Sequence, residues 1–306
     1  MTAGSAFTGC GTALVTPFRQ NLSLDESAMR ALVRRQIDAG IDFLVPCGTT
    51  GESPTLTHDE HLRVIEITVE EAAGRVPVLA GAGGYDTAKV ISMISELEKL
   101  RVSGILSVTP YYNKPTQEGL FQHFKAIAES TALPIVLYSV QPRTNVNIDV
   151  ATVVRLAAIP NIVGIKEASG SLSQVASILA RVPDSFLVLS GDDAVTIPVV
   201  ALGGHGVISV VANQIPAEFG EFTRSAIRGD YKAARRLQRK YQALMEVNFI
   251  ESSPGPLKFA MARMGLLEPA WRLPLVLPQP ASQTKIEAIL EELGLVAGVR
   301  TAGARL

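Results

Sequence analysis

Lys166 stands at the end of an apolar run, 162–166, of the type found in buried parallel strands. A buried ammonium group is costly to desolvate, and this cost favours the neutral, nucleophilic amine. Such an amine attacks a ketone and forms a Schiff base, which converts the carbon next to the carbonyl into a carbon nucleophile. The alternative is a structural lysine, whose stem packs while its ammonium group reaches the strand end or pairs with Glu167.

Two adjacent threonines, Thr49 and Thr50, follow a second apolar run, 43–47, and lie between Gly48 and Gly51. Backbone N–H groups and two hydroxyls gathered in this way suit the binding of a small carboxylate. An ordinary turn that leads into a helix uses the same residue types, so this segment alone leaves both interpretations open.

Two further runs end near tyrosines. Tyr111 and Tyr112 follow run 104–109 and cannot both face inward, so we expect one at the site and one at an interface; the alternative is that both pack at an interface. Tyr138, in run 135–140, would project toward Lys166, where a phenol is a competent proton relay. Arg143 on the following loop would bind a carboxylate through its guanidinium or form a surface ion pair.

The histidines and cysteines give no comparable pattern. His58 and His61 are three residues apart with no further ligand nearby, so we expect no metal site there. His205 precedes the last apolar run, on the face opposite the strand ends, and we interpret it as structural. Cys47 has no neighbouring histidine and is interpreted as a packed thiol.

Short β-branched runs alternate along the chain with stretches of helical periodicity. Strand–helix repeats with right-handed crossovers predict an α/β fold that closes into a (β/α)8 TIM barrel. A doubly wound sheet is the alternative, but its glycine fingerprint fails at Asp86 in 81–86. The expected strands are 12–16, 43–47, 77–80, 104–109, 135–140, 162–166, 186–190 and 206–211, and helical patterns cover 24–39, 57–73, 117–130, 171–182 and 217–228.

After the last of these stretches the strand signal stops. Helical patterns at 230–249, 255–264 and 282–293 flank a proline-rich connection, 272–278, and predict a C-terminal helical appendage. We therefore divide the chain into a catalytic barrel, 1–229, and a helical domain, 230–306, whose last residues, 297–306, we expect to be frayed.

Composition narrows the class of protein. The chain has 306 residues, 47% of them hydrophobic, and a net charge of −1, which argues against a general nucleic-acid surface. Its two cysteines form no disulfide framework, its first residues lack the blocks of a signal peptide, and no apolar run approaches the roughly 20 residues of a membrane helix. We expect a soluble, cytoplasmic protein.

Taken together, the motifs resemble those of the pyruvate-dependent Schiff-base aldolases and lyases, and within them the 4-hydroxy-tetrahydrodipicolinate synthase (dihydrodipicolinate synthase) family. The resemblance covers nearly the whole chain and is carried by 48–53, 109–113, 164–168, 190–193 and 203–209. It implies a lyase that condenses pyruvate with aspartate 4-semialdehyde in lysine and diaminopimelate biosynthesis. It further implies a homotetramer built from tight dimers, with no metal and no cofactor beyond the imine between lysine and pyruvate.

The resemblance also assigns roles to residues. Lys166 would form the imine, Thr49 and Thr50 would hold the pyruvate carboxylate, and Thr49 would link two tyrosines in a proton relay. The remaining roles fall to Tyr138 as the relay member nearest the imine, Tyr112 as the member from a neighbouring subunit, Tyr111 at the same interface, Arg143 on the second carboxylate, and Gly191 and Ile208 on the floor of the site.

Two departures from the family pattern bear on function. Ser139 replaces an asparagine, and Pro142 falls one position late, so the loop that carries Arg143 is expected to follow a different path from that of the family. This change affects the assignment of the second substrate more than that of the pyruvate chemistry. In members inhibited by lysine, the effector lies near Ser53, His58, Tyr85, Lys89 and Tyr111. Here Tyr85 and Lys89 replace the usual asparagine and glutamate. The positive charge of Lys89 would repel the ammonium group of the bound amino acid, which predicts weak or absent inhibition by lysine.

Two other functions remain as alternatives. One is a pyruvate-dependent sugar-acid aldolase or dehydratase, such as an N-acetylneuraminate lyase; the paired threonines, the double tyrosine and Arg143 favour the synthase over it. The other is a non-enzymatic barrel that retains a ligand site, which the intact lysine, tyrosine and threonine set disfavours.

Overall fold

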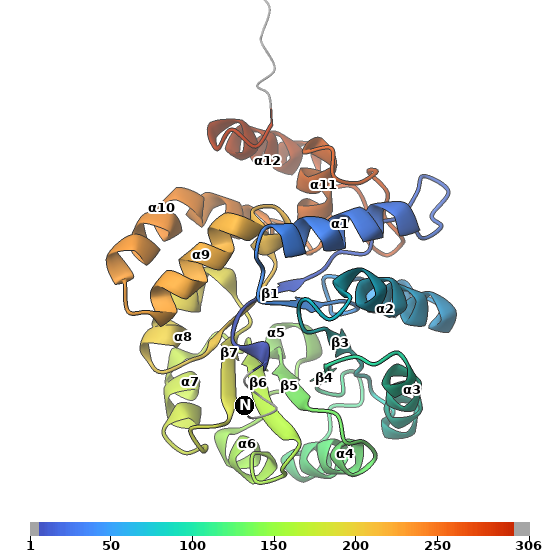
Figure 1. Cartoon of the computed structure of the whole chain (residues 1–306), viewed down its shortest axis with the longest axis vertical. Coiled ribbons are helices and arrows are strands. Elements are labelled where there is room, and N and C mark those ends of the chain that lie inside the picture. Colours follow the sequence, from blue (N-terminus) through green and yellow to red (C-terminus); the bar gives the residue numbers. More distant parts are fainter. Residues whose placement is uncertain (1–5, 297–306) are drawn as a thin grey trace, which may run out of the picture.

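The structure, a computed structural model that describes residues 6–296, is built around a sheet of eight parallel strands. The strands follow the order β2-β1-β8-β7-β6-β5-β4-β3, and a parallel bridge between Leu44 and Val78 joins the two ends of the sheet. Figure 1 looks down this barrel, and the predicted (β/α)8 architecture is confirmed. The strands are β1 (Gly9–Ala13), β2 (Phe43–Val45), β3 (Leu79–Gly81), β4 (Gly104–Val108), β5 (Ile135–Ser139), β6 (Ile162–Glu167), β7 (Leu187–Ser190) and β8 (Gly206–Ser209).

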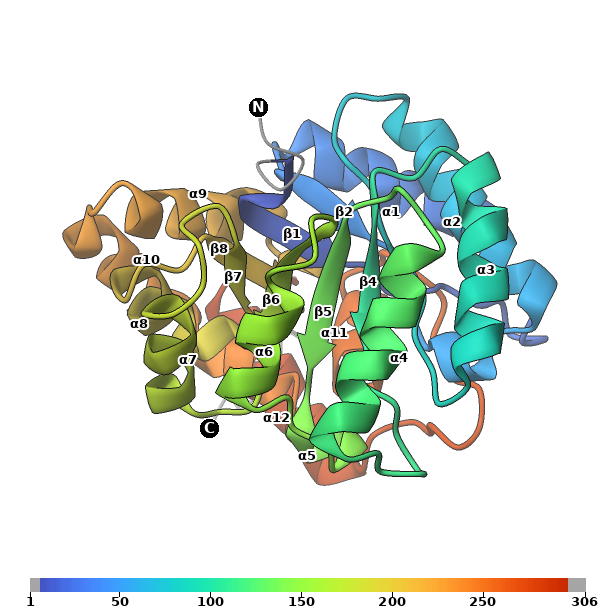
Figure 2. The same cartoon turned by 90° about the horizontal axis from the view of Figure 1, so that it is seen from below.

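Helices surround the strands on the outside, as Figure 2 shows for α4 and α6 beside β5 and β6. Thr57 and Glu60 form a capping box at the start of α2. The predicted helices end within a few residues of the observed ones. The helices of the barrel are α1 (Glu26–Asp38), α2 (His58–Ala72), α3 (Thr87–Lys99), α4 (Gln117–Glu129), α5 (Gln141–Thr144), α6 (Val150–Leu156), α7 (Leu172–Leu179), α8 (Thr196–Ala201) and α9 (Pro216–Ile227).

The first strand lies earlier than predicted. The expected strand was 12–16, but β1 is Gly9–Ala13. Glycine residues ordinarily weaken a strand, and here they are part of it because the packing leaves no room for a side chain. A Cβ atom on Gly11 would lie 2.1 Å from the ring of Phe43, so only glycine lets this aromatic side chain cross the barrel interior. The second strand was also predicted too long, since it ends at Val45 and Cys47 follows it in a left-handed conformation with φ 55°.

Buried apolar side chains form two main layers. One lines the inside of the barrel and includes Phe43, Leu106, Val136, Tyr138 and Ile208. The larger one fills the space between the strands and the helical shell. Strand residues alternate between these layers, so each strand presents every second side chain to the interior, where the chemistry is expected.

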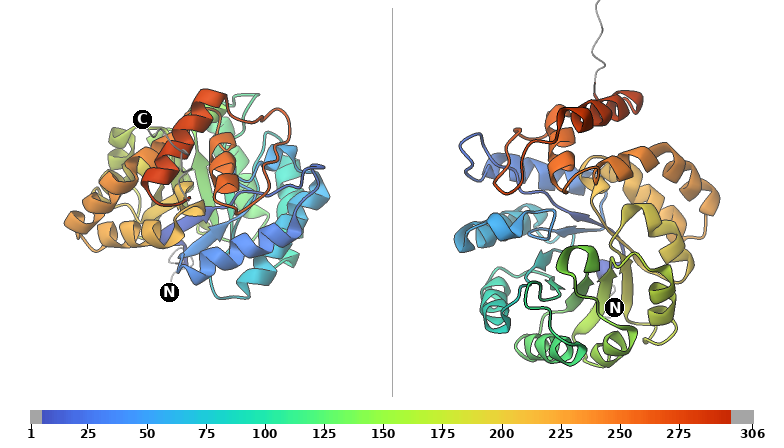
Figure 3. Two further views of the ribbon diagram at one scale, coloured as in Figure 1. Left: turned by 90° about the horizontal axis from the view of Figure 1, so that it is seen from above. Right: turned by 180° about the vertical axis from the view of Figure 1, so that it is seen from behind.

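The C-terminal helices are α10 (Tyr231–Val247), α11 (Gly255–Arg263) and α12 (Pro280–Glu292). Figure 3 shows α12 at the outer edge of the molecule, with α11 between it and the barrel. Tyr241, Phe259 and Ile286, one from each helix, belong to the same apolar cluster as the barrel shell. The helical appendage is therefore present. The boundary at 229 and 230 stays a prediction, and the expected fraying of 297–306 falls outside the described residues.

Within residues 6–296, none of the helices has the length and apolar character needed to cross a membrane.

We predict that His123 makes the folded state sensitive to mild acid. Its side chain is buried between α3 and α4, Nδ1 lies 2.9 Å from the Thr87 hydroxyl, and burial lowers its pKa from 6.5 to about 4. Below pH 6.5 His123 is protonated in the unfolded chain but stays neutral in the folded chain. The free energy of unfolding therefore decreases as the pH falls from 6.5 toward 4. The loss approaches about 1.4 kcal/mol per pH unit for this one group.

Urea unfolding between pH 8 and pH 5 measures this effect. The His123→Gln variant should show a shallower decline in the free energy of unfolding than the unaltered chain, whatever its stability at pH 8. Parallel declines in the two proteins would contradict the assignment.

Candidate active site

The pairing of β5 with β6 brings Tyr138 and Lys166 together. Val136 pairs with Gly164 after a register shift that leaves Val163 as an extra residue in β6, and Tyr138 then pairs with Lys166. Both side chains are buried, and the Lys166 Nζ lies 4.3 Å from the centre of the Tyr138 ring. Because Tyr138 belongs to the interior layer, the predicted amine lies inside the barrel.

Glu167 does not pair with Lys166. Adjacent strand residues point to opposite faces, and the Glu167 carboxylate accepts hydrogen bonds from the Ser169 N–H at 3.2 Å and the Gln174 Nε2 at 3.1 Å. Burial raises the pKa of Glu167. The alternative in which Glu167 neutralises the lysine is therefore wrong, and across residues 6–296 Lys166 takes part in no ion pair.

Glycine at position 191 leaves the space that the lysine occupies. A Cβ atom there would lie 3.2 Å from the Lys166 Cε and 2.5 Å from the Cβ of Ala168. Ile208 is fully buried in the interior layer with Tyr138. The two residues predicted to form the floor therefore lie in the barrel interior or directly beside the lysine.

Asp193 ties the loops after β7 and β8 together. Its carboxylate Oδ2 accepts hydrogen bonds from the backbone N–H groups of Val210 at 3.1 Å and Val211 at 2.8 Å. Burial raises the pKa of Asp193 to about 6. These bonds fix the chain immediately after Ile208, at the carboxyl end of the barrel.

The threonine segment after β2 forms consecutive tight turns. The Gly51 N–H donates to the Gly48 carbonyl and the Glu52 N–H donates to the Thr49 carbonyl, both at 3.1 Å. The hydroxyl of buried Thr16, which follows β1, donates to the Gly51 carbonyl at 2.7 Å. Thr50 is buried, whereas the side chain of Thr49 is partly exposed and faces a cavity.

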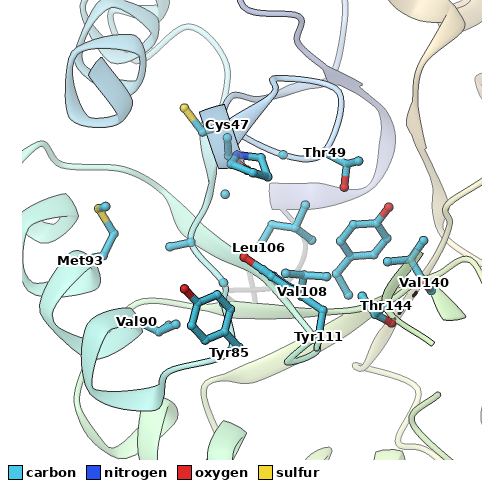
Figure 4. Close-up of a pocket in the computed structure, with 18 of the residues that line it drawn as sticks. Cys47, Thr49, Tyr85, Val90, Met93, Leu106, Val108, Tyr111, Val140 and Thr144 are labelled. Carbon is cyan, nitrogen blue, oxygen red and sulfur yellow. Dashed lines mark hydrogen bonds between the residues drawn. The ribbon is translucent and has the colours of Figure 1, made fainter. Parts of the chain in front are cut away.

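This cavity has a volume of about 470 Å³ and opens at the carboxyl ends of the strands. Figure 4 shows Thr49, Val140 and Thr144 on one side of it and Tyr85, Val90 and Met93 on the other, with Tyr111 between them. Tyr138 and Arg143 also line the cavity, as do Ser53 and Lys89. Lys166, Thr50, Gly191, Ile208, Tyr112 and His58 are not part of its lining; Lys166 borders it through the Tyr138 ring.

The two adjacent tyrosines point in different directions, as predicted. Tyr111 lines the cavity and meets the Tyr85 ring edge to face at 5.3 Å, and burial raises the pKa of Tyr111. Tyr112 has a left-handed backbone with φ 67° and a side chain that is 90% exposed. A single chain therefore does not bring Tyr112 to the predicted site.

Arg143 lies on the short helix α5, whose first turn contains Pro142. Its guanidinium donates to the Ser253 carbonyl at 3.0 Å, and this residue precedes α11. The shifted proline therefore starts a helical turn that leaves Arg143 exposed at the cavity and in contact with the C-terminal appendage.

The histidines and Cys47 have structural partners. His58 Nε2 lies 3.2 Å from the Glu96 carboxylate, His61 Nε2 lies 2.8 Å from the Gly81 carbonyl, and His205 Nδ1 accepts from the Val188 N–H. Burial lowers the pKa of both His61 and His205 and raises that of the Cys47 thiol. Among the described residues, no cluster of three or more histidine, cysteine or acidic side chains is placed to hold a metal ion.

Sequence reasoning missed a pair of buried charges, Glu52 and Lys258. The two are 206 positions apart, and their side chains meet at 2.6 Å. Neither lies in a run whose periodicity marks a charge as buried, so the only sequence signal was the position of Glu52 next to the paired threonines.

Comparison with known proteins agrees with this architecture. The model of the dihydrodipicolinate synthetase family matches residues 6–293. A 4-hydroxy-tetrahydrodipicolinate synthase from Koribacter versatilis is 54% identical over 289 residues, which cover 94% of this chain and 96% of the relative. The crystal structure of dihydrodipicolinate synthase from Aquifex aeolicus superposes with a TM-score of 0.93 at 41% identity, covering 95% of this chain and 100% of the other.

A third similar protein, the chloride-inhibited dihydrodipicolinate synthase of Acinetobacter baumannii complexed with pyruvate, has a TM-score of 0.93 and 39% identity, covering 94% of this chain and 99% of the other. The match of the family model to almost every described residue, together with relatives of this identity and coverage, shows that the chain belongs to the dihydrodipicolinate synthetase family.

Proposed function

We propose that this chain is a Schiff-base lyase that condenses pyruvate with aspartate 4-semialdehyde to give 4-hydroxy-tetrahydrodipicolinate, in lysine and diaminopimelate biosynthesis. The observation that carries the proposal is the buried amine of Lys166 beside the ring of Tyr138, a residue that lines a cavity together with Thr49 and Arg143. The names of its relatives favour this reaction over cleavage of a sugar acid. We further propose that the enzyme is cytoplasmic, which agrees with two free, buried cysteines.

The reaction starts at the Lys166 amine. It attacks the keto carbon of pyruvate, the nitrogen–carbon bond forms, and the carbonyl oxygen leaves as water to give a protonated imine. This imine withdraws electrons from the neighbouring methyl group, which loses a proton and leaves a nucleophilic enamine. No metal or cofactor is needed in this scheme, because the imine itself is the electron sink.

The enamine carbon then adds to the aldehyde of aspartate 4-semialdehyde, whose oxygen takes up a proton. The amine of the adduct attacks the imine carbon, the ring closes, and Lys166 leaves as the free amine. Tyr138, whose ring centre lies 4.3 Å from the Lys166 Nζ, would carry protons in these steps, with Thr49 and Tyr112 as the other relay members. Thr49 and Thr50 would hold the pyruvate carboxylate, and Arg143 would hold that of the second substrate.

The relay also gives a reason for self-association. Tyr112 is 90% exposed on a strained backbone, an arrangement that leaves a large apolar ring in water unless another molecule covers it. We propose that a second copy of the chain receives this ring and that Tyr112 completes the partner's site, with Tyr111 packing beside it. The assembly would be a homotetramer of two tight dimers.

Three predictions test the proposed function, and the first concerns the covalent intermediate. Borohydride reduction in the presence of pyruvate should fix one pyruvyl group, and mass spectrometry should locate it at Lys166. The Lys166→Arg variant should form no adduct and lose activity by at least about a thousandfold, because a guanidinium cannot form an imine. An adduct at another lysine, or none on the unaltered chain, would sink the proposed function.

The second prediction tests whether sites are shared between chains. Lys166→Ala and Tyr112→Phe variants should each be nearly inactive alone, while mixed dimers contain one intact site. Mixing equal amounts under exchanging conditions should therefore restore about a quarter of the unaltered activity. If mixing restores nothing although mass spectrometry detects mixed dimers, Tyr112 does not act on the partner chain.

The third prediction concerns regulation by lysine. Lys89 is exposed and lines the cavity together with Ser53, Tyr85 and Tyr111, so its positive charge should repel the ammonium group of lysine. Steady-state assays should show no inhibition at sub-millimolar lysine. The Tyr85→Asn/Lys89→Glu double variant should gain inhibition; sensitivity of the unaltered chain would refute the argument.

A further inference from the structure

Glu52 and Lys258 form a fully buried ion pair between the loop after β2 and helix α11. The Lys258 Nζ lies 2.6 Å from the Glu52 Oε1, and the two side chains are 0% and 1% exposed respectively. Neither side chain lines the cavity beside Tyr138, and at this burial neither can meet a substrate. Any effect of this pair on the reaction is therefore indirect and acts through the position of neighbouring residues.

Glu52 is the last residue of the proposed carboxylate-binding turns. Its N–H donates to the Thr49 carbonyl, and its own carbonyl accepts from the Thr55 N–H at 2.9 Å. The backbone of Glu52 is left-handed, with φ 54°, a conformation that disfavours a residue with a side chain. The turns that carry Thr49 and Thr50 thus end in a strained residue whose carboxylate is fixed from outside the barrel.

Stability alone does not account for this pair. An apolar pair of the same size stabilises a protein interior as well as a buried ion pair does, because desolvation offsets the attraction between the charges. The second carboxylate oxygen of Glu52 is also buried and has no hydrogen-bond partner among the described residues, which adds to the cost. A directional tether between two chain segments is what the charges supply and apolar contacts do not.

The same appendage holds neighbouring loops. Lys258 and Arg272 lie 4.3 Å and 4.0 Å from the centre of the Phe18 ring, in the loop after β1. Arg272 also donates to both carboxylate oxygens of Glu60 and to the Thr55 carbonyl at 2.9 Å. The C-terminal appendage therefore contacts the segment after Glu52 as well as Glu52 itself.

We infer that Glu52 and Lys258 are positioning residues for pyruvate, which tether the Thr49–Thr50 turns to helix α11 so that their hydroxyls and N–H groups stay in place for the carboxylate. The inference rests on the proposed function. It assigns a role in the reaction to the C-terminal appendage, although none of its described residues lines the cavity.

The Lys258→Met variant tests the tether. This substitution leaves the buried Glu52 carboxylate without a partner. The turns should then shift so that the carboxylate becomes hydrated. The KM for pyruvate should rise by at least about tenfold, while kcat at saturating pyruvate falls by less than about threefold, since binding of the carboxylate is lost and the amine is not. The matched control is Arg263→Met on the same helix as Lys258, which removes an exposed ion pair with Glu287 of α12 and should leave KM unchanged.

Two further variants keep the test decisive. Glu52→Gln retains a hydrogen-bonding oxygen and should fold even if Lys258→Met does not, with a smaller rise in KM. The Glu52→Gln/Lys258→Met double variant should regain thermal stability but not affinity for pyruvate. A folded Lys258→Met with a KM within about twofold of the unaltered chain, or an unchanged KM in Glu52→Gln, would overturn the inference.

The unaltered chain separates this inference from the proposed function. If it forms the pyruvyl adduct at Lys166 while the variants bind pyruvate normally, only the positioning role fails. If it forms no adduct, the proposed function fails first.

Discussion

The rest of the site depends on one constraint, the need to keep an amine out of bulk water and still within reach of a small keto acid. The closed barrel meets it through the register of two strands. Because β6 carries one extra residue against β5, Lys166 falls opposite Tyr138 on the interior face. Without that shift the alternation of side chains would turn the lysine toward the helical shell, where Glu167 now lies among Ser169 and Gln174. Glycine at 191 then leaves the volume that the long side chain fills.

The polar groups around the amine come from loops, and each loop is fixed by a contact far away in the sequence. The turns after β2 are held by Thr16 and by Lys258, the loop after β8 by Asp193, and the helix that carries Arg143 by the carbonyl of Ser253. Buried hydrogen bonds and charges of this kind cost desolvation, and here they hold the end of the barrel where position matters for chemistry. At the opposite end Asp42 accepts from the Cys10 N–H at 2.8 Å and pairs with Arg224, so long-range polar contacts hold the chain there too.

Periodicity was enough to predict the barrel and the helical appendage, because both are set by local pattern. Strand-end chemistry also indicated an inward-facing lysine, although its direction depends on the extra residue of β6 against β5. The errors occurred where tertiary packing overrides that pattern. Gly9 and Gly11 weakened the signal for β1, yet glycine is required at position 11 by the ring of Phe43 and at position 9 by the Asp42 side chain and a φ of 101°. The strand around Cys47 was predicted too long because its left-handed backbone leaves no trace in hydropathy. The partnership of Glu52 with Lys258 could not be predicted, since nothing in either segment points to the other across 206 positions.

In the proposed reaction, some steps need residues from one chain and others need residues from two chains. Lys166, Tyr138 and the threonine turns belong to a single chain, so the groups that we propose bind pyruvate and form the imine need no partner. Tyr112 stands apart, fully outside the cavity of its own chain. If it completes the relay of a neighbouring copy, self-association supplies proton transfer and leaves imine formation to the single chain. An isolated chain would then still bind pyruvate covalently but turn over slowly, because protons could not leave and return through the relay.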